Sequence, residues 1–261
     1  MNAKVDFVHA TGSSQGKRKA QEDFSSVWQP EGIGATTATR PLLAVVADGM
    51  GGHVAGQIAS RLVCEHFVKS FSNNVHNVGP GLVQALEDSN DSLATAIGDD
   101  HALSGMGSTL LAGYLDATGL RWVSVGDSTL LVYREGNLYR VNADHSHGAR
   151  LDKQAEAGVI SQQAAKADPR RHALHSALTG ERIPLQDLSL QPASLAPNDV
   201  LIFATDGLLT LSGDAIASLI RQYHYDTPQK IANELLWGVE KGHVPRQDNT
   251  TLIVVQVKPR A

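Results

Sequence analysis

Residues 42–52 read LLAVVADGMGG, and residues 200–207 read VLIFATDG. Each stretch is a short apolar run that ends in Asp-Gly. An apolar run of this length predicts a buried β-strand, and the Asp-Gly pair predicts the turn that ends it. The two predicted strands therefore present Asp48 and Asp206 at their ends.

Helical patterns follow both strands. Apolar residues recur with a period near 3.6 over residues 55–73 and again over 82–97, and the same pattern returns over 215–223 and 228–239. We expect the first two helices to pack as a pair against a sheet.

The segments between these helices are rich in strand patterns. Runs at 107–115, 120–125, 130–133 and 138–141 alternate with turns, which predicts an antiparallel meander, and a last strand is predicted at 250–257. Helices and strands therefore come in blocks. This order favours an α+β layered domain over a doubly wound nucleotide-binding fold.

Residues 144–178 differ from the rest because they are polar and carry only short helical patterns, at 150–158 and 161–167. They are interpreted as a flap-like insertion. No linker-like composition divides the chain, so the sequence predicts one domain over residues 1–261 with this insertion.

Composition excludes several classes of protein. The chain has 261 residues, 42% of them hydrophobic, and a formal net charge of −5, so neither disorder nor binding to nucleic acid or an anionic membrane is predicted. The single Cys64 makes no internal disulfide. Without a signal peptide or an apolar membrane span in the sequence, we expect a cytoplasmic protein, and we expect a monomer.

Acidic residues lie at the edges of four predicted strands. Carboxylates brought together at adjacent strand ends repel one another unless cations neutralise them, and oxygen ligands without cysteine favour Mg²⁺ or Mn²⁺. Such ions activate water for the hydrolysis of phosphoryl groups. An Asp-Gly pair alone is more often a simple turn, so the inference depends on all four sites: Glu22–Asp23, Asp48, Asp206 and Asp248.

Seven short motifs, in order along nearly the whole chain, resemble those of the metal-dependent serine/threonine protein phosphatases of the 2C type, in their compact bacterial form. The motifs are RKAQED at 18–23, VADGMGGH at 46–53, GMGSTL at 105–110, VGDS at 125–128, ALTG at 177–180, ATDGL at 204–208 and DNTT at 248–251. Each motif alone is weak, but seven in the same order are specific.

The resemblance implies an antiparallel β-sandwich flanked by pairs of helices on both faces, in α-β-β-α layers, with two Mn²⁺ or Mg²⁺ ions at one end. It implies that Asp48 bridges both ions. Asp206 and Asp248 then bind one ion, and Glu22 binds the other together with the carbonyl group of Gly49.

Further residues match supporting roles in the same family. Asp23 would act on an ion through water, and Asp127 would hold a third, weaker ion together with Asp206. The alternative for Asp127 is an aspartate in a simple hairpin turn. Arg18 matches the arginine that binds the phosphate, a role that suits the planar guanidinium group. Met50 stands where animal members have a proposed acid, which makes His53 a candidate substitute. Because His53 stands at the start of a predicted helix, a capping or packing role is the alternative.

Other basic residues have plainer interpretations. The histidine pairs at 145 and 147 and at 172 and 175 could suggest zinc, but without cysteine or a clear third ligand they are better interpreted as exposed or hydrogen-bonded side chains. Arg170 and Arg171 are interpreted as a solvated turn, with contact to an acidic or phosphorylated substrate as the alternative.

The sequence therefore predicts an enzyme that hydrolyses phosphoserine and phosphothreonine on proteins, the targets of a cognate serine/threonine kinase. The alternative from another class is a catalytically weak module that binds phosphoproteins. Such a module would be expected to have lost metal ligands, whereas Glu22, Asp48, Asp206 and Asp248 are all present.

Overall fold

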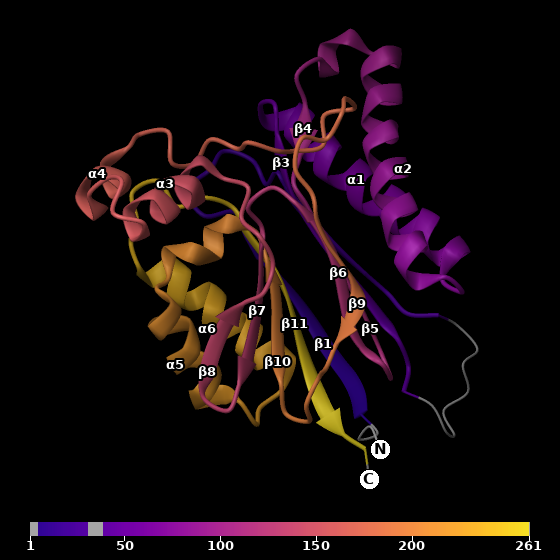
Figure 1. Cartoon of the computed structure of the whole chain (residues 1–261), viewed down its shortest axis with the longest axis vertical. Helices are drawn as coiled ribbons and strands as arrows, with labels where there is room; N and C mark the ends of the chain where they lie inside the picture. Colours follow the sequence, from indigo (N-terminus) through magenta and orange to yellow (C-terminus); the bar gives the residue numbers. More distant parts are fainter. Residues whose placement is uncertain (1–4, 31–38, 261) are drawn as a thin grey trace.

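The computed structural model describes residues 5–30 and 39–260, and two antiparallel sheets lie face to face in it (Figure 1). The first sheet has five strands. In spatial order they are β1 (Val5–Ser14), β11 (Thr250–Pro259), β10 (Val200–Ala204), β7 (Thr129–Arg134) and β8 (Asn137–Arg140).

The second sheet carries the strand that ends in Asp48. Its spatial order is β2 (Asp23–Trp28), β3 (Leu42–Met50), β5 (Leu110–Asp116), β6 (Gly119–Val125) and β9 (Asp187–Ala193), and the short β4 (Gly107–Ser108) pairs with the end of β3. The predicted strands at 42–47, 200–205 and 250–257 are thus confirmed, and the second of them ends one residue earlier than predicted, at Ala204.

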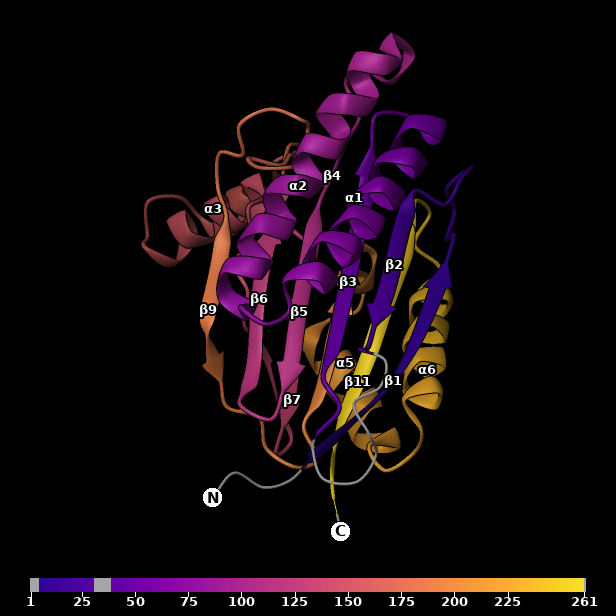
Figure 2. The ribbon, with the colours of Figure 1, turned by 90° about the vertical axis from the view of Figure 1, so that its right-hand side faces the viewer.

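Two pairs of helices cover the outer faces of the sandwich. Helices α1 (His53–Asn74) and α2 (Val78–Asp99) lie over the second sheet, as Figure 2 shows, while α5 (Gly213–Tyr223) and α6 (Pro228–Lys241) lie over the first. The four predicted helices and the α-β-β-α layers are confirmed. A 3₁₀ helix, η1 (His101–Leu103), follows α2, and another, η2 (Asp206–Thr210), follows β10.

Three apolar clusters hold these layers together. The middle cluster joins the facing sides of the sheets and includes Leu111, Phe203 and Ile253, while the outer two attach each helix pair to its sheet. Burial of apolar surface on both faces explains why the central strands are continuous apolar runs rather than alternating ones.

The predicted meander is wrong in one respect. Strands β5 and β6 pair in the second sheet and β7 and β8 pair in the first, so the chain crosses between the sheets at residues 126–128. Gly126 makes this crossing possible with φ of 103°, a value that side chains disfavour. The crossing places Asp127 at the end of the sandwich rather than in a simple hairpin turn.

Residues 144–178 lie at the same end and carry α3 (His147–Glu156) and α4 (Gln162–Ala167) (Figure 1). Helix α3 begins three residues earlier than the apolar pattern indicates, because the Ser146 hydroxyl accepts a hydrogen bond from the Ala149 amide at 3.1 Å and caps it. A bridge between Ser146 and Leu174 closes the segment. Within the described ranges, no helix combines the length and apolar character needed to cross a membrane.

Candidate active site

The acidic strand ends meet at one end of the sandwich, beside the α3–α4 segment. Pairing of β2 with β3 sets Asp23 directly opposite Asp48 in the second sheet. The first sheet joins them through Thr205, which precedes Asp206 and donates its hydroxyl proton to Asp23 Oδ2 at 2.8 Å. The four acidic sites, far apart in sequence, therefore form one cluster.

The backbone of Asp48 is fixed on both sides. Its amide donates to Thr109 Oγ1 at 2.9 Å, and its carbonyl accepts from the Thr109 amide at 2.9 Å and the Ser108 hydroxyl at 3.1 Å. The motif that holds Ser108 and Thr109 thus anchors the carboxylate that the resemblance assigns to both ions.

Glu22 and Gly49 meet beside helix α1. A Cβ atom at Gly56 would collide with Glu22 Oε2 and would lie 3.0 Å from the Gly49 carbonyl oxygen. Only a helix without a side chain at position 56 allows these two oxygens to approach together. Their position suits the pair of ligands expected for one metal ion.

Asp248 contacts Arg18. The guanidinium Nη2 of Arg18 donates to Asp248 Oδ2, and the Asn249 amide donates to Asp248 Oδ1 at 2.8 Å. This side-chain hydrogen bond to Asp248 is the main cause that raises the pKa of Arg18, and the charges of Asp248, Asp48 and Glu22 add to it. Arg18 is thus a cation at the mouth of an acidic cluster.

Asp127 is buried at the crossing between the sheets, with only 8% of its surface exposed. Its carbonyl oxygen accepts from Arg140 Nη2 at 2.9 Å. The amide of Gly126 donates to His145 Nδ1 at 3.1 Å, and the His145 amide donates to the Gly126 carbonyl at 3.0 Å. The turn that carries Asp127 is therefore held by residues at the start of the α3–α4 segment.

Simultaneous ionisation of these carboxyl groups is unfavourable. Burial first, and then the charges of neighbouring carboxylates, raise the pKa of Asp23 to about 7, of Asp206 to about 6 and of Asp48 well above its usual range. The same causes raise the pKa of Asp127 to about 7. Cations would remove this repulsion.

Two buried oxygens, Asp23 Oδ1 and Asp206 Oδ1, also make no hydrogen bond within the described residues. Unpaired buried oxygens are costly unless a ligand or water uses them. The donors are all oxygens, so the cluster fits Mn²⁺ or Mg²⁺.

In the described part of the chain, the acidic side chains are not arranged around one ion position. Among residues 5–30 and 39–260, no three His, Cys, Asp or Glu side chains stand close enough together to coordinate one ion. Asp248 is engaged by Arg18. Release of this ion pair is one rearrangement that binding would require.

The raised pKa values predict a pH effect on stability in EDTA. A carboxyl whose pKa is higher in the folded state stabilises the fold fully below its unfolded value near 4, and this contribution is lost as the pH rises through the folded value. For Asp206, with a pKa of about 6, Asp206→Asn is expected to gain on the order of 2 kcal/mol relative to wild type between pH 4 and pH 7.5.

Urea unfolding in EDTA at these two pH values measures the difference. Addition of Mn²⁺ at pH 7.5 should raise the unfolding free energy of wild type more than that of Asp206→Asn. If the difference in unfolding free energy between the two proteins were the same at both pH values, the pKa of Asp206 would not be raised in the folded state.

Of the three remaining candidates, the structure describes the side chains of Arg170 and Arg171 but not that of His53. His53 is the first residue of α1, but its side chain lies outside the described part of the chain, so its role as an acid stays a prediction. Arg171 pairs with Asp152 at 2.7 Å and Arg170 with Asp168 at 3.3 Å. The two arginines therefore serve local ion pairs, which supports their interpretation as a turn.

The histidine pairs also have local partners. His145 binds Gly126, and His147 Nδ1 lies 3.3 Å from His175 Nε2. The described residues around them supply no group of three potential ligands, so the zinc interpretation finds no support. His147 Nε2 makes no hydrogen bond within the described residues, and His172 lies near enough to Asp206 to oppose the rise in its pKa that burial causes.

Sequence reasoning assigned no role to Asn249, which organises the site. Its Oδ1 accepts from the Glu22 amide at 2.8 Å, and its Nδ2 donates to the carbonyls of Gln15 and Ala20 at 2.9 and 3.0 Å. The side chain thus ties the segment that carries Arg18 and Glu22 to the strand end that carries Asp248. The feature of the sequence that points to Asn249 is its position directly after Asp248, a candidate metal ligand.

Comparisons with known proteins agree with this geometry. A family model described as protein phosphatase 2C matches residues 33–236. A putative protein phosphatase 2C-type of Streptococcus pyogenes is 28% identical over 184 residues, which cover 68% of this chain and 72% of the relative. The serine/threonine protein phosphatase PstP of Mycobacterium tuberculosis is 28% identical over 82% of this chain and 40% of its own length.

A solved structure adds a likeness in three dimensions. The catalytic domain of PstP in complex with two manganese ions matches with a TM-score of 0.77 and 27% identity, over 97% of this chain and 99% of that one.

Proposed function

Because the chain belongs to the protein phosphatase 2C family, we propose that it is a metal-dependent phosphatase acting on phosphoserine and phosphothreonine in proteins. The observation that carries the proposal is the cluster of Asp48, Asp206 and Asp23, whose pKa values burial and mutual repulsion raise. The relatives named as serine/threonine phosphatases and the manganese complex of PstP support it.

In this proposal the metal centre uses the residues at the strand ends. Asp48 would contact both ions, Asp206 and Asp248 would hold one of them, and Glu22 would hold the other with the Gly49 carbonyl. Asp23 would act through water, and Asp127 would hold a third ion together with Asp206. Bound Mn²⁺ or Mg²⁺ supplies a water molecule of lowered pKa and compensates charge on the phosphoryl group.

Arg18 would bind the phosphate group of the substrate. Arg18 is half-exposed at the mouth of the cluster, with 57% of its side chain accessible. Its planar guanidinium can hold two phosphate oxygens at once when it leaves Asp248. Met50 carries no transferable proton, so His53 or a third ion held by Asp127 would assist protonation of the serine or threonine leaving group in this scheme.

Several finer points belong to the same proposal. The substrates are phosphoproteins modified by a cognate kinase, and the enzyme works as a monomer in the cytoplasm. Residues 144–178 act as a flap on a single domain spanning the chain. The hydrogen bonds between His145 and Gly126, the residue before Asp127, support the flap. The cognate kinase follows from the reaction itself, because a phosphatase acts on phosphate groups that a kinase has added.

Hydrolysis of p-nitrophenyl phosphate and of a phosphothreonine peptide, each with Mn²⁺, Mg²⁺ or EDTA, tests the function. We expect release of phosphate from both substrates with a divalent ion and none with EDTA. Tight binding of the phosphopeptide without release of phosphate over hours would support the binding-module alternative instead.

Arg18→Ala is expected to lower kcat/KM for the phosphopeptide about ten- to hundredfold. A hydrogen bond to a charged group contributes about 1.5–3 kcal/mol, which corresponds to this range. Steady-state kinetics measures the effect, and Lys19→Ala, which removes an exposed neighbouring charge, is the matched control. Equal kinetics for both variants would mean that Arg18 is only a surface charge.

A further inference from the structure

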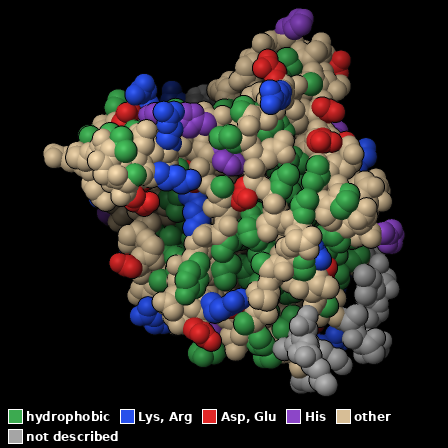
Figure 3. Space-filling model, in the orientation of Figure 1, with side chains coloured by type: hydrophobic (Ala, Val, Ile, Leu, Met, Phe, Trp, Pro, Cys, Tyr) green, Lys and Arg blue, Asp and Glu red, His purple; other side chains and the backbone are tan. Residues whose placement is uncertain are grey.

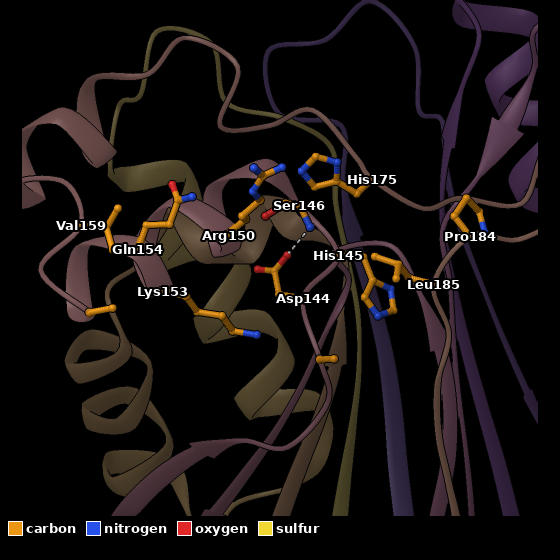
Figure 4. Close-up of a pocket in the computed structure, with 12 residues that line it drawn as sticks. Asp144, His145, Ser146, Arg150, Lys153, Gln154, Val159, His175, Pro184 and Leu185 are labelled. Carbon is orange, nitrogen blue, oxygen red and sulfur yellow. Dashed lines mark hydrogen bonds between the residues drawn. The ribbon is translucent and has the colours of Figure 1, made fainter.

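A cavity of about 670 Å³ lies between helix α3 and the loop that leads to β9, outside the acidic cluster (Figure 4). Arg150 and Lys153 line it from α3, and Leu185 lines it from the opposite side. Figure 3 shows basic and histidine side chains gathered along the base of the α3–α4 segment. The cavity is thus a second concave surface at the same end of the molecule.

The cavity presents two cations that form no ion pair with a described acidic side chain. Arg150 and Lys153 are exposed and form no ion pair with another described residue. Asp144, which lies between them in Figure 4, is already engaged: Arg140 Nη1 donates to it at 2.8 Å and the Ser146 amide at 2.9 Å. Two cations therefore remain for an anionic ligand.

The other part of the lining is apolar. Val159 and Leu185 are 69% and 47% exposed, and Pro184 lies beside Leu185. Exposed apolar side chains that flank a pair of cations suit an occupant with both an apolar and an acidic side chain. A small inorganic anion would leave the apolar part uncovered.

The wall of the cavity is bonded to the segment that carries Asp127. His145 lines the cavity and exchanges two hydrogen bonds with Gly126, the residue before Asp127. One pair of hydrogen-bonded residues therefore connects the cavity wall to a candidate metal ligand. An extended peptide segment suits an occupant that reaches from the acidic cluster into this cavity.

We infer that this cavity binds an acidic, partly apolar segment of the substrate protein, next to the phosphorylated residue in sequence. Arg150 and Lys153 pair with Asp or Glu side chains of that segment, and Val159 and Leu185 cover an apolar side chain. The inference rests on the proposed phosphatase function and adds to it a preference for acidic sequence around the phosphorylated residue.

Three phosphothreonine peptides test this preference. They share the same central sequence, which contains a leucine. One has three Glu residues before the phosphothreonine, one has three Glu residues after it, and one has Gln at all these positions. KM with Mn²⁺ and the dissociation constant in EDTA, where no turnover occurs, are measured for each peptide. Two exposed ion pairs correspond to about a fivefold preference for an acidic peptide over the Gln peptide.

The variant Arg150→Ala/Lys153→Ala should reduce this preference to about one, both in KM and in the dissociation constant. The control Lys69→Ala/Lys166→Ala removes the same charge from exposed lysines outside the cavity and should keep it. The preference of wild type should also weaken in high salt, because exposed pairs are screened.

Equal KM values for all three peptides with wild type, or an equal loss in both double variants, would overturn the inference and leave the phosphatase function standing. A wild-type protein that releases no phosphate from any peptide or from p-nitrophenyl phosphate would overturn the proposed function instead. In that case, a fivefold preference in the EDTA binding measurement would still support an acidic binding site.

Discussion

Asp48→Asn is expected to reduce kcat/KM at saturating Mn²⁺ by roughly a thousandfold or more while the fold is retained. The substitution keeps the size of the side chain but removes the charge that would contact both ions. The fold should survive because the backbone of Asp48 is held by Ser108 and Thr109. Loss of a buried carboxylate that neighbouring carboxylates repel should also raise stability in EDTA.

Steady-state kinetics and thermal unfolding of the same preparations measure these effects. Asp214→Asn is a suitable control because Asp214 is an exposed carboxylate in the first turn of α5. Turnover by Asp48→Asn close to that of Asp214→Asn would place the metal centre elsewhere.

Gly56→Ala is expected to weaken Mn²⁺ binding about ten- to hundredfold, the range seen when a group that orients a metal ligand is changed. The new methyl group would collide with Glu22 Oε2 and press on the Gly49 carbonyl at 3.0 Å. Glu22 can move aside because its carboxylate is the end of a flexible side chain, but it then leaves its place as a ligand. The phosphatase activity should fall at limiting Mn²⁺.

The unfolding free energy of Gly56→Ala in EDTA should rise or stay equal to that of wild type. Alanine is the better helix former by about 1 kcal/mol, and this gain offsets the contact of the new methyl group. Gly98→Ala in α2 is the matched control, since a Cβ atom there has no neighbour within 4 Å. Calorimetric titration with Mn²⁺ compares the two. Equal Mn²⁺ affinities of the two variants would show that Glu22 is not a metal ligand.

The sequence contains strong signals for the central layers of this fold. Strands β3 and β10 are continuous apolar runs because both of their faces are buried, and the amphipathic helices have a clear period. The ends of these elements carry the acidic residues, so the placement of Asp48 and Asp206 at strand ends could be predicted from local patterns, whereas their assignment as metal ligands needed all four acidic sites and the resemblance to a known family.

Other parts depend on contacts that no local pattern contains. Strand β9 is an edge strand with Pro192 and mostly exposed or half-exposed residues, so it lacks the periodic signal of a buried strand. The crossing at Gly126 resembles a hairpin turn until the sheet pairing is known. Asn249 gains its role only when residues more than 200 positions earlier fold against it.

Location of Mn²⁺ in crystals by anomalous scattering tests the metal centre most directly. The account predicts two strong peaks, both contacted by Asp48, with Asp206 and Asp248 at one and Glu22 with the Gly49 carbonyl at the other. A weaker third peak is expected beside Asp127. Peaks at the His147 and His175 pair, or ions that do not contact Asp48, would contradict the account.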